Sequence, residues 1–245
     1  MYIPNIFKQF PNLITAESNR LGGISESPYS SLNLGIYTND RSENVMENRN
    51  IFFNSLNIKS SNIADSHQIH SDKILYVNQS GHYEGYDALI TDKIAINLCV
   101  TIADCTPILI YDSKNKIVCA IHAGWRGTIE QIVLKTLNYL QLNFKTKGSD
   151  CFAYIGTCID KNSFEVGEEV ALHFSDDHKS FIKEKNKFYV DLKEANKTQL
   201  TSFDIPKNQI EISTFSTVLN NDKYFSFRKE NGLTGRMIAL IGMKD

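Results

Sequence analysis

Short apolar runs alternate with amphipathic stretches from residue 13 to residue 241. Runs rich in β-branched and aromatic residues, bounded by Asp, Asn, Gly or Lys, are typical of buried strands, although short runs alone do not exclude helix. The pattern predicts strands at 13–16, 74–77, 87–91, 94–100, 107–111, 117–123, 152–155, 188–190, 210–213, 224–227 and 237–241.

The clearest helix is expected at 128–144, where apolar residues recur at i, i+3, i+4 and i+7. Thr128 with Gln131 fits a capping box at its start. Similar spacing predicts helices at 42–56, 167–174 and 191–200, the last capped by Asp191 with Glu194.

Two segments lack this periodicity. Residues 21–43 are dense in Gly, Ser, Asn and Pro, which predicts a long ordered loop, and loops of that length are often functional. Residues 175–187 are charged and are expected to be a solvated excursion. Strands and helices otherwise alternate to the C-terminus with no linker or repeat, so residues 1–245 are predicted to form one mixed α/β domain.

Composition narrows the class of protein. The 245 residues are 42% hydrophobic, enough for a sizeable core, and the net charge of −2 offers no basic surface for nucleic acid or anionic membrane. No apolar run reaches the roughly 18 residues of a membrane span. Five cysteines without a CxxC pair and a start without signal-peptide character predict a cytoplasmic protein with reduced thiols.

Polar residues with catalytic potential interrupt the predicted core strands. Asp104 and Cys105 fall at the break between the first two of three successive apolar runs, 94–100, 107–111 and 117–123, and His122 lies at the end of the third run. His67 and His70 precede the predicted strand at 74–77. In an extended segment, residues three apart point to opposite faces, so one of these two histidines is expected at the site unless the chain turns.

Cys105, His122 and a third histidine supply one sulfur and two nitrogen ligands. Such a set holds Zn²⁺ and leaves one coordination position open, which is the pattern of catalytic zinc. Copper(I) tolerates the same ligands. The alternative is metal-free chemistry, with Cys105 as a thiolate nucleophile and a histidine as its base. Spacing does not separate these possibilities.

A second candidate site is the segment Gly124-Trp125-Arg126-Gly127-Thr128, which joins a strand to the predicted helix. Free N–H groups at a helix start and the Arg126 cation together describe an anion site suited to phosphate. Arginine is scarce in this chain, with six residues, and it is the side chain for bidentate anion contacts. The alternative is an ordinary tight strand–helix turn.

These residues carry a resemblance to a known family. The segments are Arg20-Leu21-Gly22-Gly23, Asn33-Leu34-Gly35, Glu47-Asn48-Arg49, Gln68-Ile69-His70-Ser71, Ala103-Asp104-Cys105-Thr106-Pro107, His122-Ala123-Gly124-Trp125-Arg126-Gly127, Phe164-Glu165-Val166-Gly167, Phe225-Ser226-Phe227-Arg228 and Gly235-Arg236. In this order they resemble the bacterial laccase-domain proteins, also called multicopper polyphenol oxidase-like proteins or peptidoglycan editing factors. That family is associated with purine nucleoside phosphorylase activity.

The resemblance implies a single-domain layered mixed α/β sandwich with a zinc site of His70, Cys105 and His122. It also decides between the two histidines, in favour of His70. The implied reaction is phosphorolysis of adenosine, inosine, guanosine or methylthioadenosine to free base and sugar phosphate, with adenosine deamination besides. Nucleosides and phosphate are thus the expected partners, with no nucleic acid, no membrane, and either a monomer or a homodimer.

Three residues receive roles on the same basis. Arg126 is expected to hold phosphate, and Arg49 is a second candidate for substrate or phosphate, with a solvated surface charge as its alternative. Asp104 is expected to act as a base or to fix the ribose or purine. Ser216-Thr217, where a Cys-Thr pair is expected, and Ser71 after His70 depart from the family pattern without touching the proposed ligands.

Two other enzyme functions remain open. A copper polyphenol oxidase is one, but a true multicopper centre needs about ten His and Cys ligands, and six scattered histidines leave at most weak copper chemistry at one site. The other is editing of peptidoglycan precursors that carry a wrong amino acid, whose nucleotide moiety suits a nucleoside-shaped pocket. A non-enzymatic metal-binding protein would hold stoichiometric metal without turnover of any nucleoside.

Overall fold

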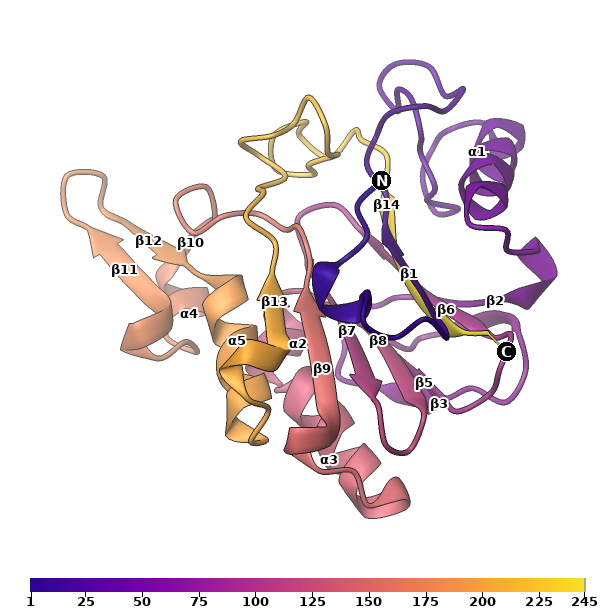
Figure 1. Cartoon of the computed structure of the whole chain (residues 1–245). Helices are drawn as coiled ribbons and strands as arrows, with labels where there is room; N and C mark the ends of the chain where they lie inside the picture. Colours follow the sequence, from indigo (N-terminus) through magenta and orange to yellow (C-terminus); the bar gives the residue numbers. More distant parts are fainter. Residues whose placement is uncertain (245) are drawn as a thin grey trace.

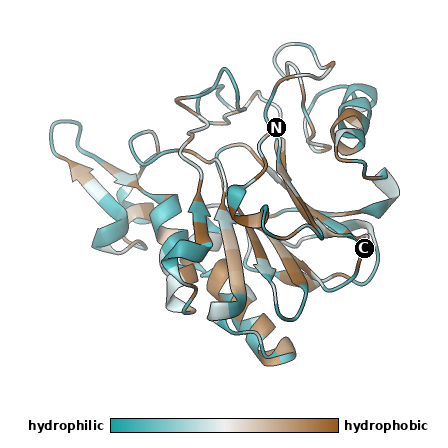
Figure 2. Cartoon of the chain, viewed as in Figure 1, coloured by the Kyte–Doolittle hydropathy of each residue, from teal (hydrophilic) through white to brown (hydrophobic). Residues whose placement is uncertain are grey.

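Two large sheets pack face to face, and helices cover their outer faces (Figure 1). The computed structural model describes residues 1–244. Apolar side chains form a central core between the sheets and further cores between each sheet and its helices. Figure 2 shows the sheet centres largely hydrophobic, with hydrophilic residues prominent on the helices and loops around them. The predicted layered mixed α/β architecture is confirmed.

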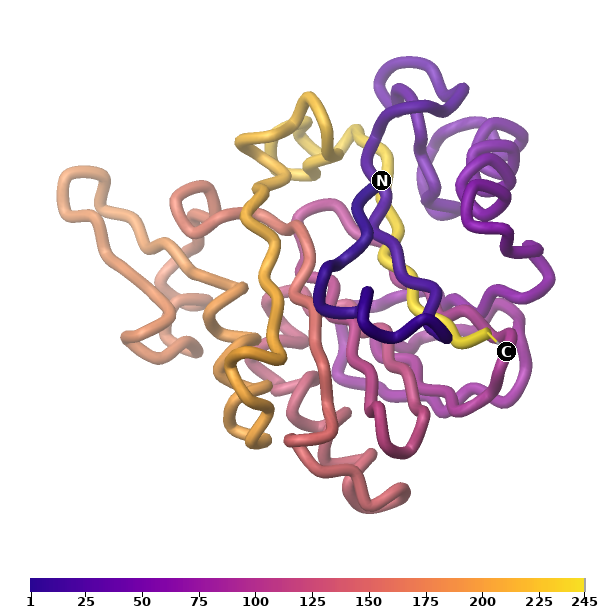
Figure 3. Tube along the Cα trace, viewed as in Figure 1, coloured from indigo at the N-terminus to yellow at the C-terminus, as the bar shows by residue number. Residues whose placement is uncertain are grey.

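The first sheet joins the two ends of the chain. Its first and last strands in the sequence, β1 and β14, pair antiparallel along their whole length, and Figure 3 shows the two terminal segments running side by side. Its strand order is β1-β14-β6-β2-β4, with bounds β1 Leu13–Glu17, β14 Met237–Met243, β6 Asn97–Ile102, β2 Ile63–His67 and β4 Gly81–Glu84.

The second sheet carries most of the predicted core strands. Its order is β13-β9-β7-β8-β5-β3, with bounds β13 Ile210–Ile212, β9 Cys151–Ile155, β7 Thr106–Asp112, β8 Ile117–Ala123, β5 Ala88–Thr91 and β3 Ile74–Tyr76. Side chains alternate between its faces: Ile108 and Ile110 join the helix-covered core, whereas Leu109 and Tyr111 join the core between the sheets. Burial on both faces explains the continuous apolar run of β7.

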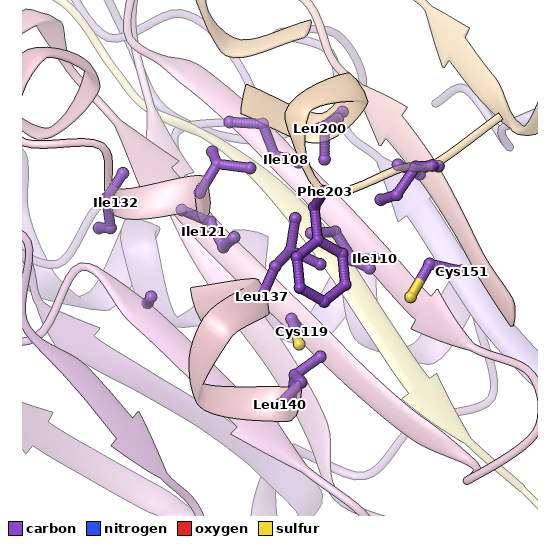
Figure 4. Close-up of a cluster of buried hydrophobic side chains, with 14 of the residues drawn as sticks. Ile108, Ile110, Cys119, Ile121, Ile132, Leu137, Leu140, Cys151, Leu200 and Phe203 are labelled. Carbon is purple, nitrogen blue, oxygen red and sulfur yellow. The ribbon is translucent and has the colours of Figure 1, made fainter. Parts of the chain in front are cut away.

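Helices close the outer faces. α1 (Ser42–Ser55) packs on the first sheet through Phe52 and Phe53. α3 (Ile132–Phe144) and α5 (Leu192–Ser202) cover the second sheet, and Figure 4 shows Leu137 and Leu140 of α3 directed toward Cys119 and Phe203. The short helices are α2 Trp125–Ile129 and α4 Glu168–Ala171, and 3-10 helices lie at η1 Asn5–Phe7, η2 Ser60–Asn62, η3 Gly148–Asp150, η4 Asp176–His178 and η5 Lys207–Gln209.

A small third sheet projects from this body at one side (Figure 1). Its order is β10-β12-β11, with bounds β10 Glu165–Val166, β12 Lys187–Val190 and β11 Lys179–Ile182. The prediction of a solvated excursion at 175–187 was therefore incomplete, because most of this segment forms η4 and one arm of a hairpin. The helix predicted at 167–174 is also shorter, since only Glu168–Ala171 is helical.

The helix predicted at 128–144 is two helices. Gln131 adopts a left-handed conformation, with φ of 60°, and separates α2 from α3. The predicted capping box is wrong, because the Thr128 hydroxyl accepts a hydrogen bond from Asn196 of α5 at 3.1 Å. The Asp191 cap is confirmed, since its side chain accepts from the backbone N–H of Glu194.

Two strand predictions also need correction, and two strands of the first sheet were not predicted. The run at 94–100 starts later, as β6, because Ala95 has a φ of 64°. Residues 224–227 form no strand, because the backbone N–H groups of Phe225 and Ser226 donate to the side chains of Met237 and Glu230. The strands β2 and β4 were not predicted, since their polar residues interrupt the apolar pattern.

Candidate metal centre

Three side chains from separate segments converge at one end of β8. His70 lies in the loop between β2 and β3, Cys105 lies between β6 and β7, and His122 belongs to β8 itself. One possible ligand atom from each lies within 4.8 Å of the other two. The imidazole rings of His70 and His122 meet edge to face, with centroids 4.9 Å apart. The fold thus brings together the three residues predicted as metal ligands.

The backbone around these residues adopts unusual conformations that permit the convergence. His70 has a φ of 59° and Asp104 a φ of 85°, values that cost side-chain-bearing residues on the order of 1–3 kcal/mol each. Gly124 lies against the site: a Cβ at this position would be 2.9 Å from His70 Cδ2 and 3.1 Å from Cys105 Sγ. Only glycine leaves both ligands where they are.

The Asp87 carboxylate positions both His122 and the loop that carries His70. This fully buried carboxylate accepts a hydrogen bond from His122 Nδ1 at 2.8 Å and from the backbone N–H of His70 at 3.1 Å, both through Oδ1. Its Oδ2 accepts from the N–H and the hydroxyl of Ser71, each at 2.7 Å, and from the N–H of Ile69 at 3.2 Å. Because His122 donates through Nδ1, its Nε2 is left as the ligand atom, which is the usual carboxylate–histidine–metal arrangement.

Cys105 and His122 form a charged pair when no metal is bound. Burial raises the pKa of the Cys105 thiol, but the neighbouring His122 and His70 outweigh it and lower the pKa to about 6. Burial lowers the pKa of His122, but Cys105 and Asp87 outweigh it and raise the pKa to about 9. The thiolate, which is the form that binds metals and acts as a nucleophile, is therefore present at neutral pH.

The donor set fits a metal with an open coordination position. One thiolate and two imidazoles match the ligands of catalytic Zn²⁺, and Cu(I) accepts the same set. His70 is exposed and Cys105 is half-buried, so an ion held here faces solvent or substrate, whereas the buried His122 anchors it from the sheet side.

Asp104 is held by the protein on both of its oxygens. Oδ1 accepts from the Thr217 hydroxyl at 2.5 Å, and Oδ2 accepts from the backbone N–H of Arg228 at 2.6 Å. Through these bonds Asp104, the residue directly before Cys105, holds the segments around Thr217 and Arg228 next to the metal centre. Its predicted role as a base or ribose contact stays a prediction.

A cavity of about 360 Å³ opens onto the three ligands. That volume lies within the range of roughly 300–1,000 Å³ found for small-molecule sites. Apolar side chains form part of its wall, and polar and charged side chains the rest. The lining residues are Gly35, Ile36, Tyr37, Arg49, Asp65, Ser66, His67, Gln68, His70, Thr101, Ala103, Asp104, Cys105, His122, Ile159, Phe164, Phe227, Arg228 and Arg236.

His67, the other candidate histidine, lies on this wall and not in the ligand cluster. Its ring stacks on Tyr37 with centroids 4.0 Å apart, and its Nδ1 lies 3.0 Å from a carboxylate oxygen of Glu84. The Tyr37 hydroxyl lies 2.6 Å from His82 Nε2, so the loop predicted at 21–43 contributes a fixed aromatic side chain to the cavity.

The two predicted phosphate ligands occupy different places. Arg49 lines the cavity but is buried and paired with Asp65 at 2.5 Å, so the alternative of a solvated charge is wrong. Arg126 is exposed and is not among the cavity residues; its guanidinium stacks on Trp125 at 4.2 Å. The helix that follows Gly124 has only five residues.

Comparison with known proteins places the chain in a family. A family model described as multi-copper polyphenol oxidoreductase laccase matches residues 14–244. The chain belongs to this family. A relative from Bacteroides thetaiotaomicron, named purine nucleoside phosphorylase, is 35% identical across 95% of this chain and 92% of its own length. The Bacillus subtilis protein named purine nucleoside phosphorylase YlmD is 29% identical across 95% and 89%.

Solved structures agree with this membership of the laccase family. The hypothetical protein YfiH of Bacillus licheniformis superposes with a TM-score of 0.91, at 28% identity, over 97% of this chain and 94% of its own. Protein NMB0706 of Neisseria meningitidis gives a TM-score of 0.85, at 30% identity, over 96% of both chains. Within residues 1–244, no helix combines the length and apolar character needed to cross a bilayer.

Sequence reasoning missed several residues around the site of this laccase-family member. Asp87 was seen only as the start of a predicted strand, although β5 pairs with β8 and places it beside His122. Gln68 holds the His70 loop to β6 through two bonds with the Thr101 backbone, at 2.7 and 2.8 Å. In the sequence Gln68 stood out only as part of the segment Gln68-Ile69-His70-Ser71, without a role of its own. Arg236 was marked only by the scarcity of arginine and by the Gly235-Arg236 segment of the family resemblance, and neither signal gave it a role.

Proposed function

We propose that this protein is a zinc-dependent purine nucleoside phosphorylase that accepts adenosine, inosine, guanosine and methylthioadenosine and also deaminates adenosine. The observation that carries the proposal is the His–Cys–His donor set at the wall of a cavity of about 360 Å³ that also contains aromatic and arginine side chains. The names of the relatives, purine nucleoside phosphorylase at 35% and 29% identity, support the same reaction.

In phosphorolysis, a phosphate oxygen forms a bond to C1′ of the ribose while the bond from C1′ to N9 of the purine breaks. The electron pair of the broken bond leaves with the purine, which takes up a proton, and the products are free base and ribose 1-phosphate. The reaction therefore requires a site for a dianion beside a site for a flat apolar base.

The chain's residues supply both kinds of contact. Phe164 and Phe227 offer aromatic surface for the base, and the Tyr37–His67 stack forms part of the same wall. Arg228 and Arg236 bring positive charge to the cavity. A zinc ion held by His70, Cys105 and His122 would act as a Lewis acid for deamination, and it would also orient the nucleoside.

Among the alternatives, a multicopper oxidase centre finds little support in this chain. Residues 1–244 contain one cluster of three possible His, Cys, Asp or Glu ligands, formed by His70, Cys105 and His122. The electron-transfer chemistry of a laccase needs several copper ions in fixed clusters.

Purified protein of known zinc content, incubated with adenosine and with inosine, with and without phosphate, tests the proposal by chromatography of the products. Phosphate-dependent release of free base is expected, together with inosine from adenosine in the absence of phosphate. Cys105→Ala should lose zinc and both activities, whereas the control Cys99→Ala, at a buried cysteine of β6, should keep them.

Failure to convert either nucleoside at full zinc occupancy would refute the phosphorylase proposal. Turnover of a muropeptide precursor by the same preparation would then favour cell-wall editing. Base release without deamination would remove only the second activity from the proposal.

A further inference from the structure

Most arginines of the chain already have an anionic or aromatic partner. Arg20 pairs with Glu230 at 3.0 Å, Arg49 pairs with Asp65, and Arg126 stacks on Trp125 outside the cavity. Arg228 and Arg236 differ from them, because both line the cavity and neither takes part in an ion pair within residues 1–244. Arg228 is exposed and both of its terminal nitrogens donate to carbonyl oxygens, of Ser163 and Glu165, whereas Arg236 is half-buried.

The Arg236 side chain is nevertheless held in place. Nη1 donates to the carbonyl oxygens of Thr234 at 2.9 Å and Gly235 at 3.0 Å. Its aliphatic part packs against Gly35, where an added Cβ would lie only 2.5 Å from Arg236 Cγ. Its guanidinium carbon lies 5.5 Å from the ring centroid of Phe227. The neutral carbonyls fix the guanidinium without neutralising its charge.

Two donor nitrogens of this group remain available. Within the described part of the chain, Nε and Nη2 of Arg236 donate to no protein acceptor. These two nitrogens form one edge of the guanidinium, which binds two oxygens of an oxyanion in parallel hydrogen bonds. Arg236 lines the same cavity as His70, Cys105 and His122. Burial lowers the pKa of Arg236, whereas the negative charges of Cys105 and Asp104 raise it.

We propose that Arg236 is the phosphate-binding residue of the cavity, with Nε and Nη2 holding two oxygens of inorganic phosphate beside the metal centre. This proposal rests on the function proposed above. A desolvated cation with a free donor edge costs free energy until an anion binds to it, so the site selects a phosphate dianion over a neutral ligand. Arg126, the residue predicted from sequence, is not among the residues that line this cavity.

Steady-state kinetics with varied phosphate at saturating inosine test the assignment. Arg236→Gln should raise the phosphate KM at least about 100-fold, because two charge-assisted hydrogen bonds are lost. Arg236→Lys should recover part of this loss, since it restores the charge but not the planar fork. Zinc content and the inosine KM should stay close to those of the wild type, which a merely structural role would not predict.

Two further variants serve as comparisons. Arg41→Gln, at an exposed arginine before α1, removes a cation distant from the cavity lining and should change no parameter. Arg126→Gln tests the competing assignment directly. A phosphate KM within twofold of the wild type in Arg236→Gln, or a tenfold rise in Arg126→Gln alone, would overturn the proposal.

Direct binding separates this proposal from the proposed function. Inorganic phosphate is titrated into zinc-loaded wild type and Arg236→Gln by isothermal calorimetry, without nucleoside. Binding to the wild type that is lost in the variant supports the subsite even if no nucleoside is turned over. Equal binding by both proteins, or none by the wild type, overturns it even if phosphorolysis is observed.

Discussion

Replacing Asp87 by asparagine tests how the metal centre is oriented. The substitution keeps the shape of the side chain but removes its charge and turns one acceptor oxygen into an NH₂ donor. Because every hydrogen-bond partner of the Asp87 carboxylate is a donor, the new NH₂ group faces donors in either orientation of the amide.

The magnitude follows from the two orientations. If NH₂ replaces Oδ2, three hydrogen bonds are lost, two from Ser71 and one from Ile69. If NH₂ replaces Oδ1, the bonds from His122 and His70 are lost. Hydrogen bonds to a charged group contribute about 1.5–3 kcal/mol each, so even the milder loss of two bonds destabilises the fold by about 3–6 kcal/mol.

Metal affinity should fall for a separate reason. With NH₂ opposite Nδ1, His122 must become an acceptor at that atom and carry its proton on Nε2, the ligand atom. Loss of such an orienting partner costs about 10–100-fold in metal affinity, and the wrong tautomer adds to this cost.

Competition with a chromophoric chelator measures the zinc affinity of Asp87→Asn, and thermal unfolding of the metal-free protein measures its stability. Asp72→Asn is the matched control, since Asp72 is a partly exposed carboxylate paired with Lys135, and it should change neither quantity by more than a small amount. Wild-type zinc affinity in a folded Asp87→Asn protein would refute the orienting role.

Three other predictions concern protons, space and burial. Between pH 6 and pH 9 the Cys105–His122 pair holds one proton, and below pH 6 it holds two. Calorimetry of zinc binding in buffers of different ionisation enthalpy should therefore detect about one proton released from the pair in the first range and about two in the second. A proton count that does not change with pH would contradict the charged pair. Gly124→Ala places a methyl group 2.9 Å from a carbon of His70. It should lower zinc affinity at least tenfold with little change in far-UV circular dichroism. An unchanged zinc affinity would show that the ligand side chains move aside easily. Burial raises the pKa of Glu17 above 4.5 despite the hydrogen bonds it accepts from neighbouring donors, so the folded state binds this proton more tightly than the unfolded state. The free energy of unfolding therefore falls as the pH rises through the raised pKa. Glu17→Gln should flatten this fall in chemical denaturation at a series of pH values, and an identical slope would exclude Glu17 as its source.

The core strands were predictable because their signal is local. β8 begins and ends where its apolar run does, and β7 extends its run by one residue at each end. Burial on both faces makes such strands continuously apolar, and the flanking polar residues mark their ends. For the same reason Cys105 and His122 stood out, as polar groups at the ends of buried strands.

Other elements depended on distant partners. Asp65 makes β2 look polar in the sequence, yet it is buried because Arg49 forms an ion pair with it and His82 forms a hydrogen bond to it. The break between α2 and α3 arises where Gln131 turns left-handed while α5 binds Thr128. Neither effect is visible in a window of neighbouring residues.

The sequence by itself determined which chemistry is available: two histidines and a cysteine at strand ends, few arginines, and a core of alternating strands. Only the tertiary structure decided how these groups are used. It pairs β5 with β8 so that Asp87 fixes His122, and it neutralises Arg49 while leaving the donor edge of Arg236 free. Charge and hydrogen-bond partners come from residues far apart in the chain, so the identity of a side chain sets its capacity and the packing around it sets its role.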